Sequence, residues 1–159
     1  MVYNSHTMPR AGVGIVLVNQ EKQVFVAKRI NSGDVDDPYW QMPQGGIDPR
    51  ENYIEAMIRE MKEETGVDEH NAEIIAESKE LYTYEIPEKY RKDCSSQIQR
   101  WFLVRLNEDD SCINLDQPHA EFSQWKWVPS GHVAKLVIDF KREVYKKVMK
   151  DFSWYFDAQ

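Results

Sequence analysis

The sequence is poor in cysteine: Cys94 and Cys112 are the only two among 159 residues. Their spacing matches neither a zinc motif nor a disulfide framework. No apolar run approaches the roughly 18 residues that a membrane-spanning helix requires. The first residues, Met1 to His6, lack the basic and then apolar pattern of a signal peptide. These absences argue against zinc-finger, secreted and membrane-spanning proteins and predict a soluble, reduced, cytoplasmic protein.

Basic residues are also in deficit, with 20 Lys and Arg against 27 Asp and Glu and a formal net charge of −7. A chain of this sign has no long-range attraction for duplex DNA or an anionic membrane. Any phosphate that it binds therefore needs a local cluster of cations or a metal ion. Apolar residues make up 42% of the chain, which is enough for a core at this length. With no repeat or low-complexity linker, one domain over residues 1–159 is predicted.

Short apolar and alternating segments predict a sheet. Residues 12–18 form a β-branched run typical of a strand buried on both faces, and residues 23–28 read as its hairpin partner. Residues 31–38 and 43–50, which are polar or rich in Gly and Pro, are predicted to be irregular. Further strands are expected at 39–42, 72–77, 81–86, 99–106 and 124–128.

Two helices are predicted. The first begins near Asn52 and ends before Gly66, and its apolar stripe is formed by Ile54, Met57, Ile58 and Met61. The second covers residues 137–152 and has its stripe at Val137, Phe140, Val144, Val148 and Phe152. The expected fold class is α/β or α+β, a sandwich of helices and a mixed sheet.

Three carboxylates of the first helix, Glu60, Glu63 and Glu64, fall within about a third of its circumference at roughly 100° per residue. Like charges this close repel unless a cation neutralises them, and oxygen ligands suit Mg²⁺ or Mn²⁺. A solvated acidic face with a Glu55–Arg59 pair is the alternative. The Gly-Gly pair just before the helix, which lets backbone approach a ligand closely, favours the metal site.

Residues 45–67 resemble the Nudix box at nine placed positions: Gly45, Glu51, Arg59-Glu60-Met61, Glu63-Glu64 and Gly66-Val67. The resemblance implies the Nudix fold, an α/β/α sandwich with a mixed sheet and a loop-helix catalytic motif. It also implies hydrolysis of a nucleoside diphosphate linked to another group. By the same resemblance Glu60 and Glu64 bind metal, Glu63 is a further ligand or the base, and Glu51 pairs with Arg59.

Metal-assisted hydrolysis is the mechanism that such residues support. Two or three Mg²⁺ or Mn²⁺ ions, held by the glutamates and the Gly45 carbonyl, would bridge phosphate oxygens and lower the pKa of a water. A carboxylate would take the remaining proton while water attacks phosphorus in line. No covalent nucleophile is needed, and no Ser-His or Cys-His arrangement lies near the box.

The similarity continues from Arg10 to Phe152 and points to the subfamily of RNA pyrophosphohydrolases and diadenosine tetraphosphate hydrolases. It implies that Glu121 adds to metal binding or base catalysis, although a solvated loop acid is the alternative. Candidate substrate contacts are Arg10, Lys28, Arg29, Gln44, Tyr84, Gln97, Phe140 and Lys141. For the basic residues a solvent-facing charge, and for Phe140 core packing, stay open as alternatives.

Three functions remain open on this basis. The leading one is a Mg²⁺-dependent pyrophosphohydrolase acting on 5′-triphosphate RNA, dinucleoside polyphosphates or both. The others are a Nudix hydrolase of a small nucleotide and a non-catalytic binding module. Retention of three mutually repelling glutamates argues against the module. The insertion at residues 31–38 and the form Trp40-Gln-Met-Pro43 resemble the diadenosine polyphosphate branch, and the run 90–94 is shorter than in the RNA-processing members.

Overall fold

The computed structural model describes residues 9–30 and 38–158. Residues Met1 to His6 and nearly all of the predicted loop at 31–38 lie outside the described ranges. The strands are β1 Pro9–Val18, β2 Val24–Arg29, β3 Gln44–Gly46, β4 Ala72–Glu77, β5 Tyr82–Glu85, β6 Ser96–Leu106 and β7 Phe122–Val128. The helices are α1 Tyr53–Thr65, α2 Val133–Leu136, α3 Arg142–Asp151 and α4 Ser153–Asp157.

The strands form one seven-stranded mixed sheet with the path β4-β6-β1-β2-β7, to which β3 adds at β1 and β5 at β6. The β1–β6 pair is parallel and the other pairs are antiparallel. The six predicted strands other than 39–42 therefore find their counterparts at or within a few residues of the expected positions.

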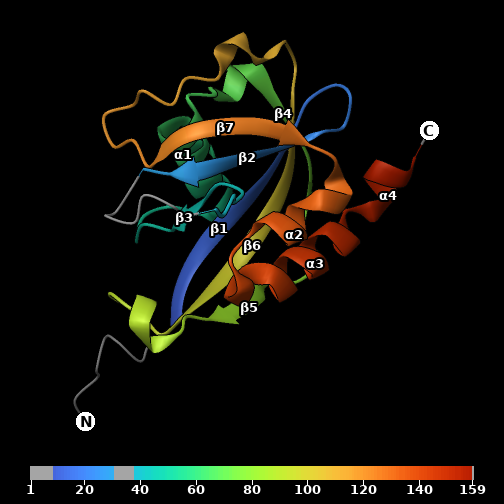
Figure 1. Ribbon diagram of the computed structural model, residues 1–159. Helices are drawn as coiled ribbons and strands as arrows, with labels where there is room; N and C mark the ends of the chain where they lie inside the picture. Colours follow the sequence, from blue (N-terminus) through green and yellow to red (C-terminus); the bar gives the residue numbers. More distant parts are fainter. Residues whose placement is uncertain (1–8, 31–37, 159) are drawn as a thin grey trace.

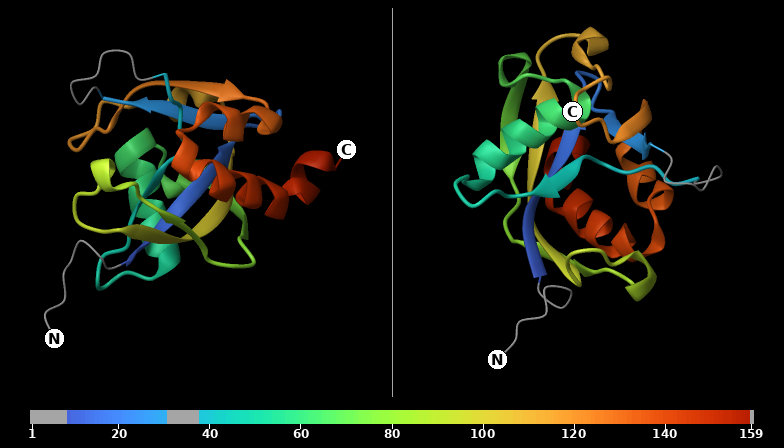
Figure 2. Two further views of the ribbon diagram at one scale, coloured as in Figure 1. Left: turned by 60° about the horizontal axis from the view of Figure 1, so that its bottom comes forward. Right: turned by 90° about the vertical axis from the view of Figure 1, so that its left-hand side faces the viewer.

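Side chains of the central strands alternate between two cores, one on each face of the sheet. Ile15 and Leu17 of β1 pack with Met57 of α1, whereas Val16 packs with Val148 of α3 on the other face. Figures 1 and 2 show α1 on one side of the sheet and α2 and α3 on the other. The result is an α/β/α sandwich, which confirms the predicted fold class and the doubly buried strand at 12–18.

The strand expected at 39–42 is wrong, since only Gln41 pairs there, in a single bridge to Ala27. Residues 44–46, expected to be irregular, instead form β3 against β1, with Gly12 opposite Gly46. A Cβ on Gly12 would lie 2.5 Å from the carbonyl oxygen of Gly45. Glycine therefore permits the close backbone approach that makes this pairing possible.

The continuous helix expected at 137–152 is also wrong. Val137 and Ile138 have extended backbones, with ψ of 157° and 146°, and α3 begins only at Arg142. The Arg142 side chain donates to the carbonyls of Ala134 and Val137 across this break. Val137 is nevertheless buried in the core beside α3. The apolar stripe therefore predicts the buried position of this side chain correctly, although the helix is not continuous.

Helix α1 matches its prediction closely at both ends. Asn52 caps its N-terminus in a reciprocal capping box with Glu55, and Gly66 ends it with φ of 79°. The prediction for Ile54 is wrong, because its side chain is 44% exposed and not part of the buried stripe. In residues 9–30 and 38–158, no helix has the length and apolar composition of a transmembrane span.

Candidate active site

The turn from β3 into α1 brings backbone and acid side chains together. The carboxylate of Glu60 lies against the Cα of Gly45, where any Cβ would collide with it. The Gly45 position therefore accepts no larger residue without displacing Glu60. The first glycine of the box thus makes room for a carboxylate beside the main chain.

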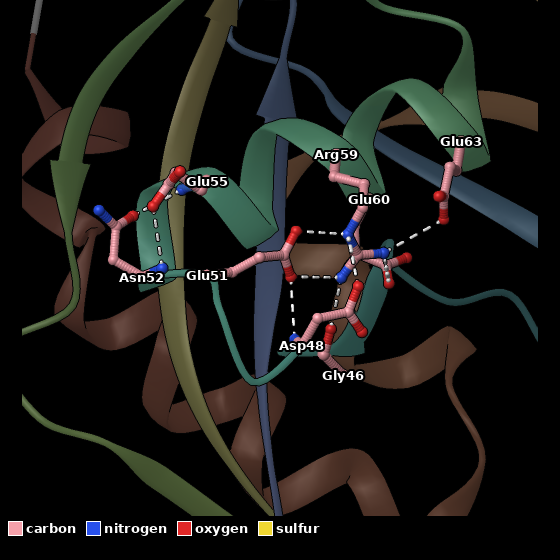
Figure 3. A network of polar contacts seen from close by, with 8 residues as sticks. All are labelled: Gly46, Asp48, Glu51, Asn52, Glu55, Arg59, Glu60 and Glu63. Atoms are coloured by element: carbon pink, nitrogen blue, oxygen red, sulfur yellow. Dashed lines mark hydrogen bonds and ion pairs between the residues drawn. The ribbon is translucent and has the colours of Figure 1, made fainter.

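Arg59 ties the loop to the helix, as Figure 3 shows. Its Nε donates to Glu51 Oε2 at 2.6 Å, and its Nη2 donates to Glu51 Oε1 and to the Gly46 carbonyl, both at 2.8 Å. The hydrogen bond from Arg59 lowers the pKa of Glu51 to about 2. The predicted Glu51–Arg59 pair is confirmed, while Glu55, its alternative partner, caps Asn52 instead.

Arg59 also reaches two of the three acids that the sequence singled out. Its Nη1 donates to Glu60 Oε1 at 2.9 Å and to Glu63 Oε2 at 3.3 Å. Within the part of the chain that the structure describes, no three Asp, Glu, His or Cys side chains form a group ready to hold an ion. The Arg59 guanidinium thus donates hydrogen bonds to two of the carboxylates that a metal ion would bind.

Glu60 and Glu64 are buried, being 8% and 2% exposed. Burial raises the pKa of Glu60 to about 7 despite its bond from Arg59, and the charges of Glu63 and Glu121 add to the rise. Burial, followed by the charges of Glu60 and Glu121, raises the pKa of Glu64 well above its usual range. The exposed Glu121 of the loop before β7 therefore lies close enough for its charge to raise the pKa of both buried acids.

The donor chemistry of this region fits a hard divalent cation. Glu64 Oε2 accepts from the backbone N–H of Gln44 at 3.1 Å, but its buried Oε1 has no hydrogen-bond partner among the described residues. An unpaired buried carboxylate oxygen is costly unless a cation or a proton satisfies it. Oxygen ligands of this kind suit Mg²⁺ or Mn²⁺.

A second wall faces these acids and carries most of the predicted substrate contacts. Gln44 Nε2 donates to the Tyr84 hydroxyl at 2.9 Å, and the Tyr84 ring lies 5.8 Å from that of Phe140. Lys141 Nζ lies 5.8 Å from the centre of the Tyr84 ring. Burial lowers the pKa of Lys141 to about 8; Arg29 adds to the shift, whereas Glu64 and Glu121 oppose it.

The sheet register brings further predicted residues to this wall. Gln97 of β6 lies opposite Arg10 of β1 on one side and opposite Tyr84 of β5 on the other. The Arg10 guanidinium covers Gly46, where a Cβ would collide with it. Lys28 is different, because its ammonium lies 5.1 Å over the Trp40 ring. No contact in the described residues joins it to the acids.

Two residues of this region have roles that the sequence analysis did not assign. Asn52 positions α1, and its Asn-x-x-Glu capping pattern was readable from the sequence. Tyr90, in a short 3₁₀ helix between β5 and β6, packs against Phe140, with the ring centres 5.5 Å apart and the ring planes tilted by 31°. No periodicity marks a single aromatic residue in a loop, so only the fold reveals this contact.

Comparison with known proteins agrees with the geometry. The NUDIX domain model matches residues 8–152. An RNA pyrophosphohydrolase of Orientia tsutsugamushi is 41% identical over 157 residues, covering 95% of this chain and 94% of the relative. An RNA pyrophosphohydrolase of Pelagibacter ubique is 44% identical over 148 residues, covering 87% and 88%.

Solved structures show the same fold at lower identity. A C. elegans Ap4A hydrolase has a TM-score of 0.69 at 21% identity, covering 93% of this chain and 98% of that one. The E. coli dihydroneopterin triphosphate pyrophosphohydrolase has a TM-score of 0.70 at 19% identity, covering 91% and 99%. With the box, the sandwich and the extent of these matches, the chain belongs to the Nudix family.

Proposed function

We propose that this protein is a divalent-metal-dependent pyrophosphohydrolase that removes pyrophosphate from the 5′ end of triphosphorylated RNA and also cleaves dinucleoside polyphosphates. The observation that carries the proposal is the closeness of the buried Glu64, with the buried Glu60 beside it, to the cationic Lys141 and Arg29. Relatives at 41–44% identity over most of the chain bear the name RNA pyrophosphohydrolase.

The acids and one carbonyl would hold the metal. Two or three Mg²⁺ or Mn²⁺ ions would be bound by Glu60, Glu63, Glu64, Glu121 and the Gly45 carbonyl. When bound, such ions neutralise phosphate oxygens and lower the pKa of water, so that hydroxide is available to attack phosphorus near neutral pH. Glu63 has a side chain 39% exposed and Glu121 is exposed, so either can accept a proton from water.

The opposite wall would hold the substrate. Arg10, Arg29 and Lys141 would neutralise the polyphosphate, and the rings of Tyr84 and Phe140 would face the first nucleoside. Gln44, whose side chain donates to Tyr84, and Gln97, which is paired with Tyr84 across the sheet, would supply amide groups to the substrate. Since the net charge is −7, recognition would centre on the 5′ end rather than on a long RNA track.

The proposal includes a cytoplasmic location. Cys94 and Cys112 are both free thiols, as in proteins of reducing compartments. We further propose that residues 1–159 act as one Nudix domain, with residues 45–67 as its catalytic motif.

Product analysis on 5′-triphosphate RNA and diadenosine tetraphosphate in parallel tests the function. We expect pyrophosphate from the RNA, ATP and AMP from the dinucleotide, and loss of both activities in saturating EDTA. Activity that survives EDTA would contradict the metal site. Inactivity on both substrates would favour a hydrolase of a small nucleotide. Affinity that grows steadily with RNA length and falls steeply with salt would contradict end recognition.

A further inference from the structure

Residues 40–44 form a strap that leads into the candidate active site between β1 and β2. Within the described residues, these two strands pair at a single position, beside the turn that joins them. Farther along, Gln41 of the strap forms a bridge to Ala27 of β2. On the other side, the Pro43 carbonyl accepts from the Ile15 N–H of β1 at 2.9 Å. The strap therefore lies in the sheet, where side chains from both faces can contact it.

Side chains from the two faces accept two N–H groups of the strap. The Met42 N–H donates to the Tyr145 hydroxyl of α3 at 2.9 Å. The Gln44 N–H donates to Glu64 Oε2 of α1, on the opposite face, at 3.1 Å (Figures 1 and 2). Pro43, between these two positions, has no N–H and a restricted φ. A short and stiff piece of main chain therefore connects the Tyr145 hydroxyl with the Glu64 carboxylate.

The Tyr145 side chain is fixed by the core on the α3 side of the sheet. It is 1% exposed, and its ring meets the Trp101 ring edge to face, with the ring centres 5.6 Å apart. Gly14 of β1 leaves room for Trp101, since a Cβ on Gly14 would lie 2.3 Å from that ring. Met42 is fully buried, so water cannot replace the Tyr145 hydroxyl as the acceptor of its N–H.

We propose that Tyr145 is a positioning residue for the metal site, because its hydroxyl holds the strap that aligns Glu64. The inference rests on the proposed function. Gln44 is the link, since its N–H bonds to Glu64 and its side-chain amide bonds to Tyr84. Without the Tyr145 hydroxyl, the strap would shift toward a new acceptor for the Met42 N–H. Glu64 would then be less well aligned for a cation.

The test measures Mn²⁺ binding to wild type and to Tyr145→Phe by electron paramagnetic resonance titration. The substitution keeps the ring and removes only the acceptor of the Met42 N–H. We expect the Kd of the tightest Mn²⁺ site to rise about 10-fold, the lower end of the effect of groups that orient metal ligands. Half-maximal activity should need about 10-fold more Mn²⁺, with kcat at saturating Mn²⁺ close to that of wild type.

Tyr82→Phe is the matched control. It removes another tyrosine hydroxyl bonded to α3, which donates to Asp151 Oδ2 at 2.7 Å. Among the described residues, no hydrogen bond joins Tyr82 or Asp151 to the strap. Tyr82→Phe should therefore bind Mn²⁺ as wild type does, even where its melting temperature falls.

An unfolded fraction lowers the number of Mn²⁺ sites but not their Kd, so a loss of stability does not mimic the expected result. An unchanged Kd in Tyr145→Phe, or an equal rise in Tyr82→Phe, would overturn the positioning role. A fall in kcat at saturating Mn²⁺ with an unchanged metal midpoint would overturn it as well. A wild-type protein that binds no Mn²⁺ would instead overturn the proposed metal-dependent function, which is a distinguishable result.

Discussion

The two walls of the candidate active site are supplied by the chain in different ways. The acidic wall comes almost entirely from one stretch, the β3–α1 loop and helix α1, with Glu121 as its only distant member. The cationic and aromatic wall is assembled from β1, β2, β5, β6 and the turn before α3. Residue spacing within one segment therefore positions the acids, whereas strand pairing positions the cationic and aromatic side chains that would contact the substrate.

The walls also differ in how their charges are balanced. Arg59 neutralises acids of its own loop and helix through close hydrogen bonds. The buried Lys141 has no such close partner in the described residues and is influenced at longer range by Glu64 and Glu121 of the facing wall. Substitutions in the acidic wall should therefore affect chemistry most, and those in the other wall should affect binding.

The largest effect is expected for Glu64→Gln in the acidic wall. Loss of a buried carboxylate should lower kcat by orders of magnitude, while the amide oxygen still accepts from the Gln44 N–H. In EDTA the melting temperature should rise, because burial and the neighbouring acids disfavour the charged form of Glu64. Glu77→Gln, at an exposed position in β4, is the control. A Glu64→Gln enzyme with wild-type kcat would remove Glu64 from the mechanism.

Arg59→Ala should have the next largest effect, on both activity and folding. It leaves Glu51 without its paired bonds and frees the Gly46 carbonyl, so kcat/KM should fall. We expect a loss of about 1–3 kcal/mol in the free energy of unfolding. Arg105→Ala, which breaks the exposed Arg105–Glu73 pair, should cost less than about 1 kcal/mol. Normal kinetics in Arg59→Ala would contradict a role for this pair in shaping the loop.

Lys141→Met should have the smallest effect on chemistry and sharpen the contrast between the walls. We expect KM to rise about 10-fold with kcat nearly unchanged, as for one lost charge-assisted hydrogen bond to phosphate. Lys147→Met, on the exposed side of α3, is the control. A large fall in kcat with unchanged KM would assign Lys141 to the chemical step instead.

The same variant has a pH signature. The folded pKa of Lys141 is about 8 against an ordinary 10.5, so between these values the unfolded chain binds more protons than the folded one. Between pH 8 and pH 10.5, Lys141 should therefore make the wild-type free energy of unfolding increase as the pH rises. Lys141→Met should lack that contribution, and chemical denaturation at several pH values measures it. Identical pH slopes in both proteins would contradict the burial of this charge.

Predictions from the sequence succeeded where neighbouring residues determine the structure. Helix α1 has its period, its capping residues and its terminal glycine within one segment. They failed at residues 39–46, because the Gly- and Pro-rich second part of that segment, which has the composition of an irregular loop, pairs with β1 where Gly12 lets the two backbones approach closely. The apolar stripe at 137–152 likewise predicted burial correctly but not the extended backbone at Val137 and Ile138.

The sequence by itself determined the acidic loop-helix motif and the class of fold, because each depends on short-range spacing and alternation, and its resemblance to the Nudix box implied the Glu51–Arg59 pair. Only the tertiary structure decided that Gln97 lies between Arg10 and Tyr84, that Lys141 is buried beside them, and that Tyr90 covers Phe140. These contacts join segments far apart in the chain. Sheet register and core packing set them, and neither leaves a periodic signal in the sequence.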